Sequence, residues 1–183
     1  ISAMLCIIIK FFKRNFVFCK MSNLEAIHFV DKTGAKILIR SYVHKKDRDR
    51  LINMYLNYNP DDRCLGLPPI TREAIEKWID YLASSGYSII AEHNGKIIGH
   101  LTVVPDGRVV DMSIYITREY QNRGIGTKMI QLIIEYCKNR RYDKITLVTE
   151  RCNPRSIHVY KKCGFRTAFK GFEYEMELPL NGN

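Results

Sequence analysis

Two glycines follow a predicted strand and precede a predicted helix, an arrangement that suits the binding of a phosphate. Residues 120–127 read YQNRGIGT, with Gly124 and Gly126 directly before a long amphipathic segment. Glycine leaves backbone N–H groups uncovered, and the positive end of a helix dipole attracts anions. Arg123 adds a positive charge beside them. The pattern predicts a site for a phosphate or diphosphate group.

A glycine pair also occurs in ordinary tight turns, so its surroundings decide which phosphate site it favours. A dinucleotide-binding fingerprint needs a third glycine and follows the first strand of a parallel sheet, whereas several antiparallel-looking strands precede residues 121–126. A Walker motif would end in Gly-Lys-Ser or Gly-Lys-Thr, which this turn lacks. These exclusions favour a cofactor phosphate on another kind of fold.

Together with a second block, residues 153–165 (NPRSIHVYKKCGF), the turn resembles the GNAT superfamily of acetyl-CoA-dependent N-acetyltransferases. Residues 121–126 match the superfamily's Q/R-x-x-G-x-G/A turn, and the second block is similar to its N-x-x-[SA]-x-x-x-Y-x-[KS]-x-G-F segment. The resemblance covers roughly residues 36–178. It implies an enzyme that moves an acetyl group from acetyl-CoA, its co-substrate, to a primary amine.

The resemblance also implies a cofactor site between two strands that separate from each other. In the family, the pantetheine arm lies between two such parallel strands, which here would be residues 109–117 and 144–149. Backbone of the first strand would contact the arm, and the turn amides would hold the diphosphate. The positions so implied are Ile114, Tyr115, Ile116, Gln121, Asn122, Arg123, Gly124, Ile125, Gly126, Thr127, Asn153, Ser156, Tyr160 and Lys162.

Two residues of the second block carry the roles that the family assigns to it. Tyr160 matches the tyrosine that protonates the departing CoA thiolate, and a phenol pKa of about 10 suits a weak acid in that role. Asn153 matches the asparagine that hydrogen-bonds the cofactor arm. The alternatives are a core aromatic for Tyr160 and a helix cap before Pro154 for Asn153.

The general base that would deprotonate the amine is not evident. Many family members carry a glutamate at the position that is Ser113 here. Asp111 lies two residues earlier and, by strand alternation, on the same face as Ser113 and Tyr115. Glu150, at the end of the other strand, is the second candidate. Either carboxylate could act directly or through water, either could be a plain surface residue, and the amine could instead lose its proton in bulk water.

The preferred acceptor is a protein or peptide amine, either a lysine or an N-terminus. A polyamine or aminoglycoside would favour a cluster of carboxylates in the substrate loops, and these offer only Asp61, Asp62 and Glu73. A small amine remains an alternative. A different class of function is also open, namely a non-catalytic module of the same fold that senses acyl-CoA or binds nucleic acid.

The elements that would position these residues follow from hydrophobic periodicity and turn signals. Their order predicts a single mixed α/β (α+β) domain. The resemblance implies a mostly antiparallel twisted sheet of about seven strands with a splayed parallel pair, flanked by about four helices. The expected strands are 25–30, 36–43, 87–92, 96–104, 109–117, 144–149, 165–170 and 172–178, and the expected helices are 46–58, 72–85, 124–140 and 154–163.

The composition predicts a folded, basic protein. A chain of 183 residues that is 46% hydrophobic can build a core, and no apolar run is long enough to span a membrane. A balance of 29 Lys and Arg against 19 Asp and Glu gives a net charge of +10, which favours anionic partners. Cofactor phosphates account for part of this charge, so nucleic acid is not the expected partner.

The cysteines and the first residues bear on the setting of the protein. The six cysteines show no metal-ligand spacing, so we expect no metal and read them as reduced thiols of a cytoplasmic protein. The superfamily resemblance also implies that the protein forms a homodimer. Residues 1–20 carry four basic and no acidic residues. We interpret them as a vector-derived or wrongly assigned extension before a domain at 21–183, with a membrane-surface segment or an added element as alternatives.

Overall fold

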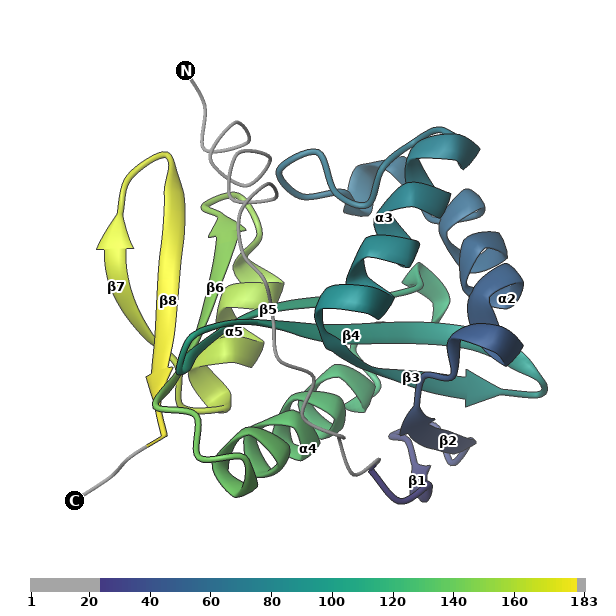
Figure 1. Cartoon of the computed structure of the whole chain (residues 1–183), viewed down its shortest axis with the longest axis horizontal. Helices are drawn as coiled ribbons and strands as arrows, with labels where there is room; N and C mark the ends of the chain where they lie inside the picture. Colours follow the sequence, from purple (N-terminus) through teal and green to yellow (C-terminus); the bar gives the residue numbers. More distant parts are fainter. Residues whose placement is uncertain (1–23, 181–183) are drawn as a thin grey trace.

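An eight-stranded sheet runs through the computed structural model, which describes residues 24–180 (Figure 1). The strand order is β1-β2-β3-β4-β5-β6-β8-β7, and every neighbouring pair is antiparallel except β5 and β6. The mixed fold class is confirmed, and the eight strands correspond to the eight expected ranges, where the resemblance implied about seven. The strands are β1 (Ile27–Val30), β2 (Lys36–Ser41), β3 (Tyr87–His93), β4 (Lys96–Asp106), β5 (Val109–Ile116), β6 (Lys144–Glu150), β7 (Arg166–Lys170) and β8 (Glu173–Pro179).

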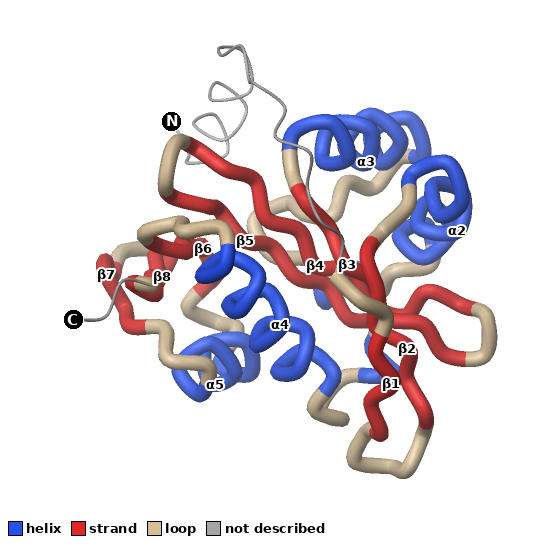
Figure 2. The backbone as a smooth tube through the Cα atoms, turned by 60° about the horizontal axis from the view of Figure 1, so that its bottom comes forward, coloured by secondary structure: helices blue, strands red, loops and turns tan. Residues whose placement is uncertain are grey.

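Helices cover both faces of the sheet (Figure 2). The first pair packs on one face and the second pair on the other, each with its own apolar core. Thr71 caps the start of α3, because its Oγ1 accepts a hydrogen bond of 3.3 Å from the Ala74 amide. The helices are α2 (His44–Leu56), α3 (Arg72–Ser85), α4 (Ile125–Asn139) and α5 (Pro154–Lys162), with short 3₁₀ turns η1 (Pro60–Asp62) and η2 (Arg118–Tyr120).

Strand β5 separates the two cores by its alternation. Met112 and Ile114 pack with α4, whereas Tyr115 packs with α2 and α3. Asp111 and Ser113 therefore share the face of Tyr115, as strand alternation predicts. Side chains from both faces of the sheet can thus contribute to a site built along β5.

Strands β5 and β6 pair over three residues and then separate. Val109, Val110 and Asp111 pair with β6, and Thr146 Oγ1 donates to the Val110 carbonyl at 3.3 Å where the pairing ends. Beyond that point β5 remains paired with β4, and β6 with β8. The facing edges expose backbone groups that an extended ligand could pair with. The splayed parallel pair that the superfamily resemblance implies is confirmed.

The expectations about the first residues, the cysteines and membrane helices can be compared with the structure only over residues 24–180. Residues 1–20 lie outside the described range, together with Cys6 and Cys19. Within that range Cys64, Cys137, Cys152 and Cys163 are free thiols. No helix between residues 24 and 180 is long and apolar enough to cross a membrane.

Candidate active site

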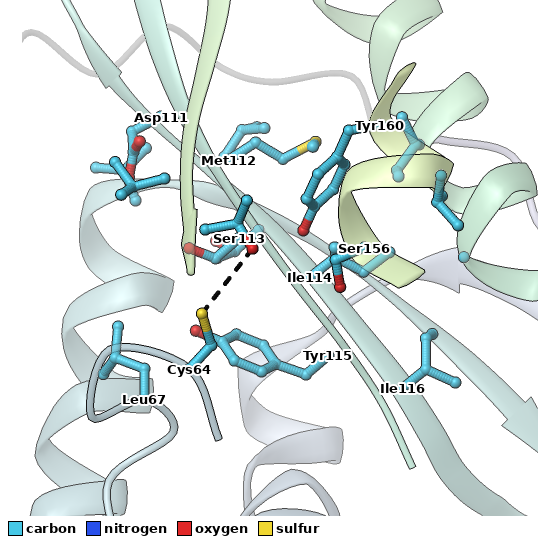
Figure 3. A pocket seen from close by; sticks show the side chains of 18 of the residues that line it. Cys64, Leu67, Asp111, Met112, Ser113, Ile114, Tyr115, Ile116, Ser156 and Tyr160 are labelled. Carbon is cyan, nitrogen blue, oxygen red and sulfur yellow. Dashed lines mark hydrogen bonds between the residues drawn. The ribbon is translucent and has the colours of Figure 1, made fainter. Parts of the chain in front are cut away.

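A cleft of about 2050 Å³ follows the gap between β5 and β6. Residues from α4 and α5 line it on one side of the sheet, and residues from α3 and the segment after α2 line it on the other. Figure 3 shows Tyr160 and Ser156 of α5 facing β5, and its dashed line starts at Cys64, whose Sγ lies 4.0 Å from Thr149 Oγ1 on β6. The cleft therefore passes through the sheet at the point where the strands separate.

The glycine turn forms one end of this cleft. Gly124 has φ +87° and Asn122 has φ +62°, both in the left-handed region that reverses the chain. The first intrahelical bond of α4 joins the Lys128 amide to the Gly124 carbonyl at 3.0 Å. The amides at the start of α4 precede that bond, so they have no partner within the helix and suit a diphosphate.

Arg123, the cation expected beside the turn, faces the first hairpin. Its guanidinium lies 4.7 Å from the Tyr120 ring centroid and 3.6 Å from Asp31 Oδ2. Burial opposes the charge of Asp31, but hydrogen bonds from Thr33 and Ala35 and the charge of Arg123 outweigh it and hold the pKa of that carboxyl below its usual value. The positive charge of Arg123 is therefore paired with the buried carboxylate of Asp31.

Gln121 joins three elements. Its Nε2 donates to the Ile116 carbonyl at 3.1 Å and to Asp62 Oδ2 at 3.2 Å, and its Oε1 accepts from Arg155 Nη1 at 3.1 Å. Arg118 forms a two-pronged ion pair with the same Asp62, at 2.9 and 3.0 Å. Gln121 thus ties η1 and α5 to the end of β5, which positions the turn that follows it.

Tyr160 is 8% exposed and lies in the core beside α4, where it also lines the cleft. Burial raises the pKa of Tyr160 above its ordinary value, and a hydrogen bond with Ser156 acts in the opposite direction. Its phenol is therefore protonated at neutral pH. The position fits the core aromatic considered for Tyr160, and the same residue borders the cleft.

The other positions of the second block also line the cleft. Asn153 caps α5, since its Oδ1 accepts a hydrogen bond of 3.2 Å from the Ser156 amide. Lys162 lies in the last turn of the same helix and is exposed. Both line the cleft with Ser156. The helix-cap role considered for Asn153 is therefore present.

Glu150 secures a turn that reaches across from the segment after α2. Its Oε1 accepts from the Leu65 amide at 2.7 Å, and its Oε2 accepts from Cys152 Sγ at 3.1 Å. The Glu150 amide in turn donates to Cys64 Sγ at 3.4 Å. Burial raises the pKa of the Cys64 thiol. Cys64 was missed by sequence reasoning, because nothing near it in the sequence indicates that it meets β6.

The other candidate base lies on the opposite strand. Asp111 is exposed and lines the same cleft as Glu150. Two residues on, Ser113 hydrogen-bonds Tyr115, whose pKa is raised by burial. The structure therefore brings the two carboxylates and Ser113 to one cleft, from two strands.

An aromatic wall borders the cleft on the side of α3. Trp78 lies edge-on to Tyr115 with ring centroids 5.5 Å apart, and Tyr58 lies edge-on to Tyr115 at 6.1 Å. A hydrogen bond from the Ile116 backbone reaches the Tyr58 phenol. Tyr58, Trp78 and Tyr115 all line the cleft. Sequence reasoning did not place this wall, since its residues come from three separate elements.

Comparison with known proteins relates this geometry to one family. The sequence model described as "Acetyltransferase (GNAT) family" matches residues 48–165. The L-amino acid N-acetyltransferase AaaT of Escherichia coli strain K12 is 29% identical over 150 residues, covering 78% of this chain and 90% of that protein. Mycothiol acetyltransferase of Tsukamurella paurometabola is 26% identical over 140 residues, covering 70% of this chain and 48% of that protein.

Solved structures share the fold. The GNAT domain of S. lividans PAT aligns with a TM-score of 0.75 at 14% identity, over 84% of this chain and 96% of that one. An acetyltransferase of the same family from Streptococcus pneumoniae aligns with a TM-score of 0.68 at 23% identity, over 79% of this chain and 99% of that one. At these identities the likeness shows the arrangement of the sheet and helices.

Proposed function

The chain belongs to the GNAT family of acetyltransferases and is an acetyl-CoA-dependent enzyme, and we propose that it acetylates a primary amine in the gap between β5 and β6. The observation that carries this proposal is the separation of the two strands beyond Asp111, which opens the cleft beside the buried Tyr160. An amine entering from one face of the sheet can there meet a thioester held from the other.

The residues around the gap fit acetyl-CoA as a substrate. The start of α4 lies beside β5, since a methyl group on Gly126 would make an ordinary contact of 3.7 Å with Ile114 Cδ1. We assign the diphosphate to the amides from Arg123 to Thr127. Backbone of Ile114, Tyr115 and Ile116 would border the pantetheine arm and acetyl group. The side chains assigned to the same cofactor are Gln121, Asn122, Asn153, Ser156, Tyr160 and Lys162.

Acetyl-CoA supplies the activated acetyl group, and this chain supplies the proton transfers. Tyr160 would protonate the sulfur that leaves, because burial keeps its phenol in the acid form. Asp111 or Glu150 would take the proton from the amine, directly or through water. Both carboxylates line the cleft, although Glu150 also holds the Leu65 amide.

The proposal also concerns which amine accepts the acetyl group. Sequence reasoning prefers a protein or peptide lysine or N-terminus. The turn at residues 64–67 favours a small amine instead, because Glu150 ties it to β6 and its residues line the acceptor side of the cleft. The aromatic wall favours an amine attached to an apolar group. A relative named for L-amino acid N-acetylation agrees with this second candidate.

A release assay for free CoA tests the proposal. The enzyme with acetyl-CoA would be offered L-amino acids, polyamines, and peptides with either a free N-terminus or an internal lysine. Acceptor-dependent release with acetylated product supports the proposal and ranks the acceptors. Saturable CoA binding without turnover on any amine would instead favour an acyl-CoA sensor. Absence of CoA binding, with salt-dependent RNA binding in its place, would favour the nucleic-acid module.

Two expectations about setting accompany the proposed function. We propose a cytoplasmic enzyme, on the basis of the free thiols in the described range. We also propose a homodimer, on the basis of the family resemblance alone. Light scattering during size-exclusion chromatography would decide between one and two copies.

A further inference from the structure

The first hairpin of the sheet packs against the glycine turn. The Lys32 amide donates to the Arg123 carbonyl at 3.1 Å, which joins the β1–β2 connection to the loop before α4. Figure 2 shows this hairpin beside the start of α4. The hairpin precedes the part of the chain that the family model matches, residues 48–165. Any contact that this hairpin makes with the glycine turn therefore lies outside the region that the family model matches.

The carboxylate of Asp31 gives the connection a defined shape. Its Oδ1 accepts from the Thr33 amide at 2.8 Å, from the Thr33 hydroxyl at 2.7 Å and from the Ala35 amide at 2.9 Å. Its Oδ2 lies 3.6 Å from Arg123 Nη1. Because the Arg123 charge is paired with this buried carboxylate, a further cation at the turn would strengthen the attraction for a diphosphate.

Lys32 is the cation that lies against Gly124, in a cleft that Lys128 of α4 and Arg155 and Lys162 of α5 also line. A methyl group placed on Gly124 would lie 3.9 Å from Lys32 Cε and 4.0 Å from Lys32 Cγ, so the lysine stem runs alongside the turn. Lys32 is exposed and lines the cleft together with Gly124, Gly126 and Thr127. Within residues 24–180 no salt bridge engages its ammonium group. A positive charge therefore stands at the mouth of the turn.

We propose that Lys32 binds the diphosphate of CoA, and that the β1–β2 hairpin is thereby part of the cofactor site. The inference rests on the proposed placement of the diphosphate at the start of α4. Arg123 acts as a positioning residue, since it fixes the hairpin through Asp31. Lys32 supplies the charge that complements the uncovered amides.

Calorimetric titration of CoA into three proteins tests this role. We expect Lys32→Gln to weaken CoA binding about tenfold at low ionic strength, with a smaller effect at higher salt because the charge is exposed. Lys36→Gln is the matched control, because Lys36 is an exposed lysine of the same hairpin that does not line the cleft. It should bind CoA as the wild type does.

Two truncated ligands locate the phosphate that Lys32 contacts. 3′-Dephospho-CoA keeps the diphosphate, so its binding should weaken in Lys32→Gln by the same factor as that of CoA. S-acetyl-pantetheine lacks all phosphates, so kcat/KM with this donor should be the same in the wild type and the variant. These results would support the assignment.

The outcomes that overturn the inference differ from failure of the proposed function. Equal CoA affinity in the wild type and Lys32→Gln would remove Lys32 from the site, and equal losses in both lysine variants would indicate a general charge effect. Loss of the effect with 3′-dephospho-CoA would move Lys32 to the 3′-phosphate. If the wild type itself does not bind CoA, the proposed site fails instead.

Discussion

At the scale of single residues, the proposed chemistry depends on a phenol that stays protonated. Because burial raises the pKa of Tyr160, its acid form persists through neutral pH and above. We expect Tyr160→Phe to lower kcat about 100-fold, the lower end of the usual contribution of a general acid, with CoA affinity nearly unchanged. Steady-state rates and calorimetry measure the two quantities. Wild-type activity should not fall between pH 7 and 9 through loss of this proton.

A second tyrosine provides the control for this substitution. Tyr136 on α4 is also buried, and its hydroxyl has no hydrogen-bond partner among the described residues. Tyr136→Phe removes the same atom without removing a hydrogen bond within the described residues, so its kcat should match the wild type. Equal rates in Tyr160→Phe and the wild type would exclude Tyr160 as the acid.

The two carboxylates at the cleft differ in what else they do, and this makes them separable. Glu150→Gln removes the carboxylate but keeps an oxygen that can accept from the Leu65 amide, so we expect at most a small rise in the KM of the acceptor, with little change in kcat. Asp111→Asn should lower kcat/KM about tenfold or more and remove the acidic limb of its pH profile. Profiles of both variants from pH 5 to 9 make the comparison. An acidic limb that disappears only in Glu150→Gln would assign the base to Glu150.

At the scale of elements, the two glycines of the turn before α4 differ in how they would tolerate a side chain. Gly126 lies in the first turn of the helix, where a methyl group would make ordinary contacts of 3.7 and 3.8 Å with Ile114 and Ile116. We therefore expect Gly126→Ala to keep or raise the unfolding free energy, by up to about 1 kcal/mol. The methyl group would point at these two side chains, and the superfamily turn accepts alanine at this position, so CoA affinity should stay close to that of the wild type.

Gly124 gives the contrasting result. With φ +87°, it has a conformation that alanine adopts only under strain, so Gly124→Ala should destabilise the fold by about 1 to 2 kcal/mol. Urea unfolding and CoA titration of both variants test the pair. A larger loss of stability in Gly126→Ala than in Gly124→Ala would contradict this distinction between the two glycines.

Elements that are continuous in the sequence were predicted well, and contacts between distant elements were not. The β5–turn–α4 and β6–α5 units follow from local periodicity, turn residues and caps, which act within a few residues. The partners of Arg123 and Gln121 are Asp31 and Asp62, which belong to other segments. Their approach is decided by packing of the whole sheet. For the same reason the sequence did not place Lys32 beside Gly124.

At the scale of the whole molecule, buried charges connect the first hairpin to the first helix. Arg40 on β2 pairs with Asp47 on α2 at 2.7 Å and with Glu92 on β3 at 2.7 Å, and Arg50 completes the group. Burial opposes the charge of Asp47, but Arg40 and the Val43 amide hold its pKa below the usual value. This network fixes the hairpin that carries Lys32 to the body of the sheet.

One buried histidine gives the fold a pH dependence of its own. His100 on β4 is 1% exposed, its Nδ1 lies 2.6 Å from the Tyr55 hydroxyl, and its Nε2 has no hydrogen-bond partner in the described range. Burial lowers the pKa of His100 to about 3. The folded state therefore holds the neutral ring, whereas the unfolded chain binds a proton near pH 6.5. Stability from this group is complete above pH 6.5 and is lost progressively as the pH falls towards 3.

Urea unfolding at several pH values measures this contribution. Each pH unit below 6.5 costs about 1.4 kcal/mol, so the unfolding free energy should be about 2 kcal/mol lower at pH 5 than at pH 7.5. His100→Gln should remove most of that difference, whatever its stability at pH 7.5. His28→Gln, at an exposed position on β1, should retain it. If the same loss of stability at low pH persists in His100→Gln, groups other than His100 cause it, because this variant has no buried ring that could take up a proton on unfolding.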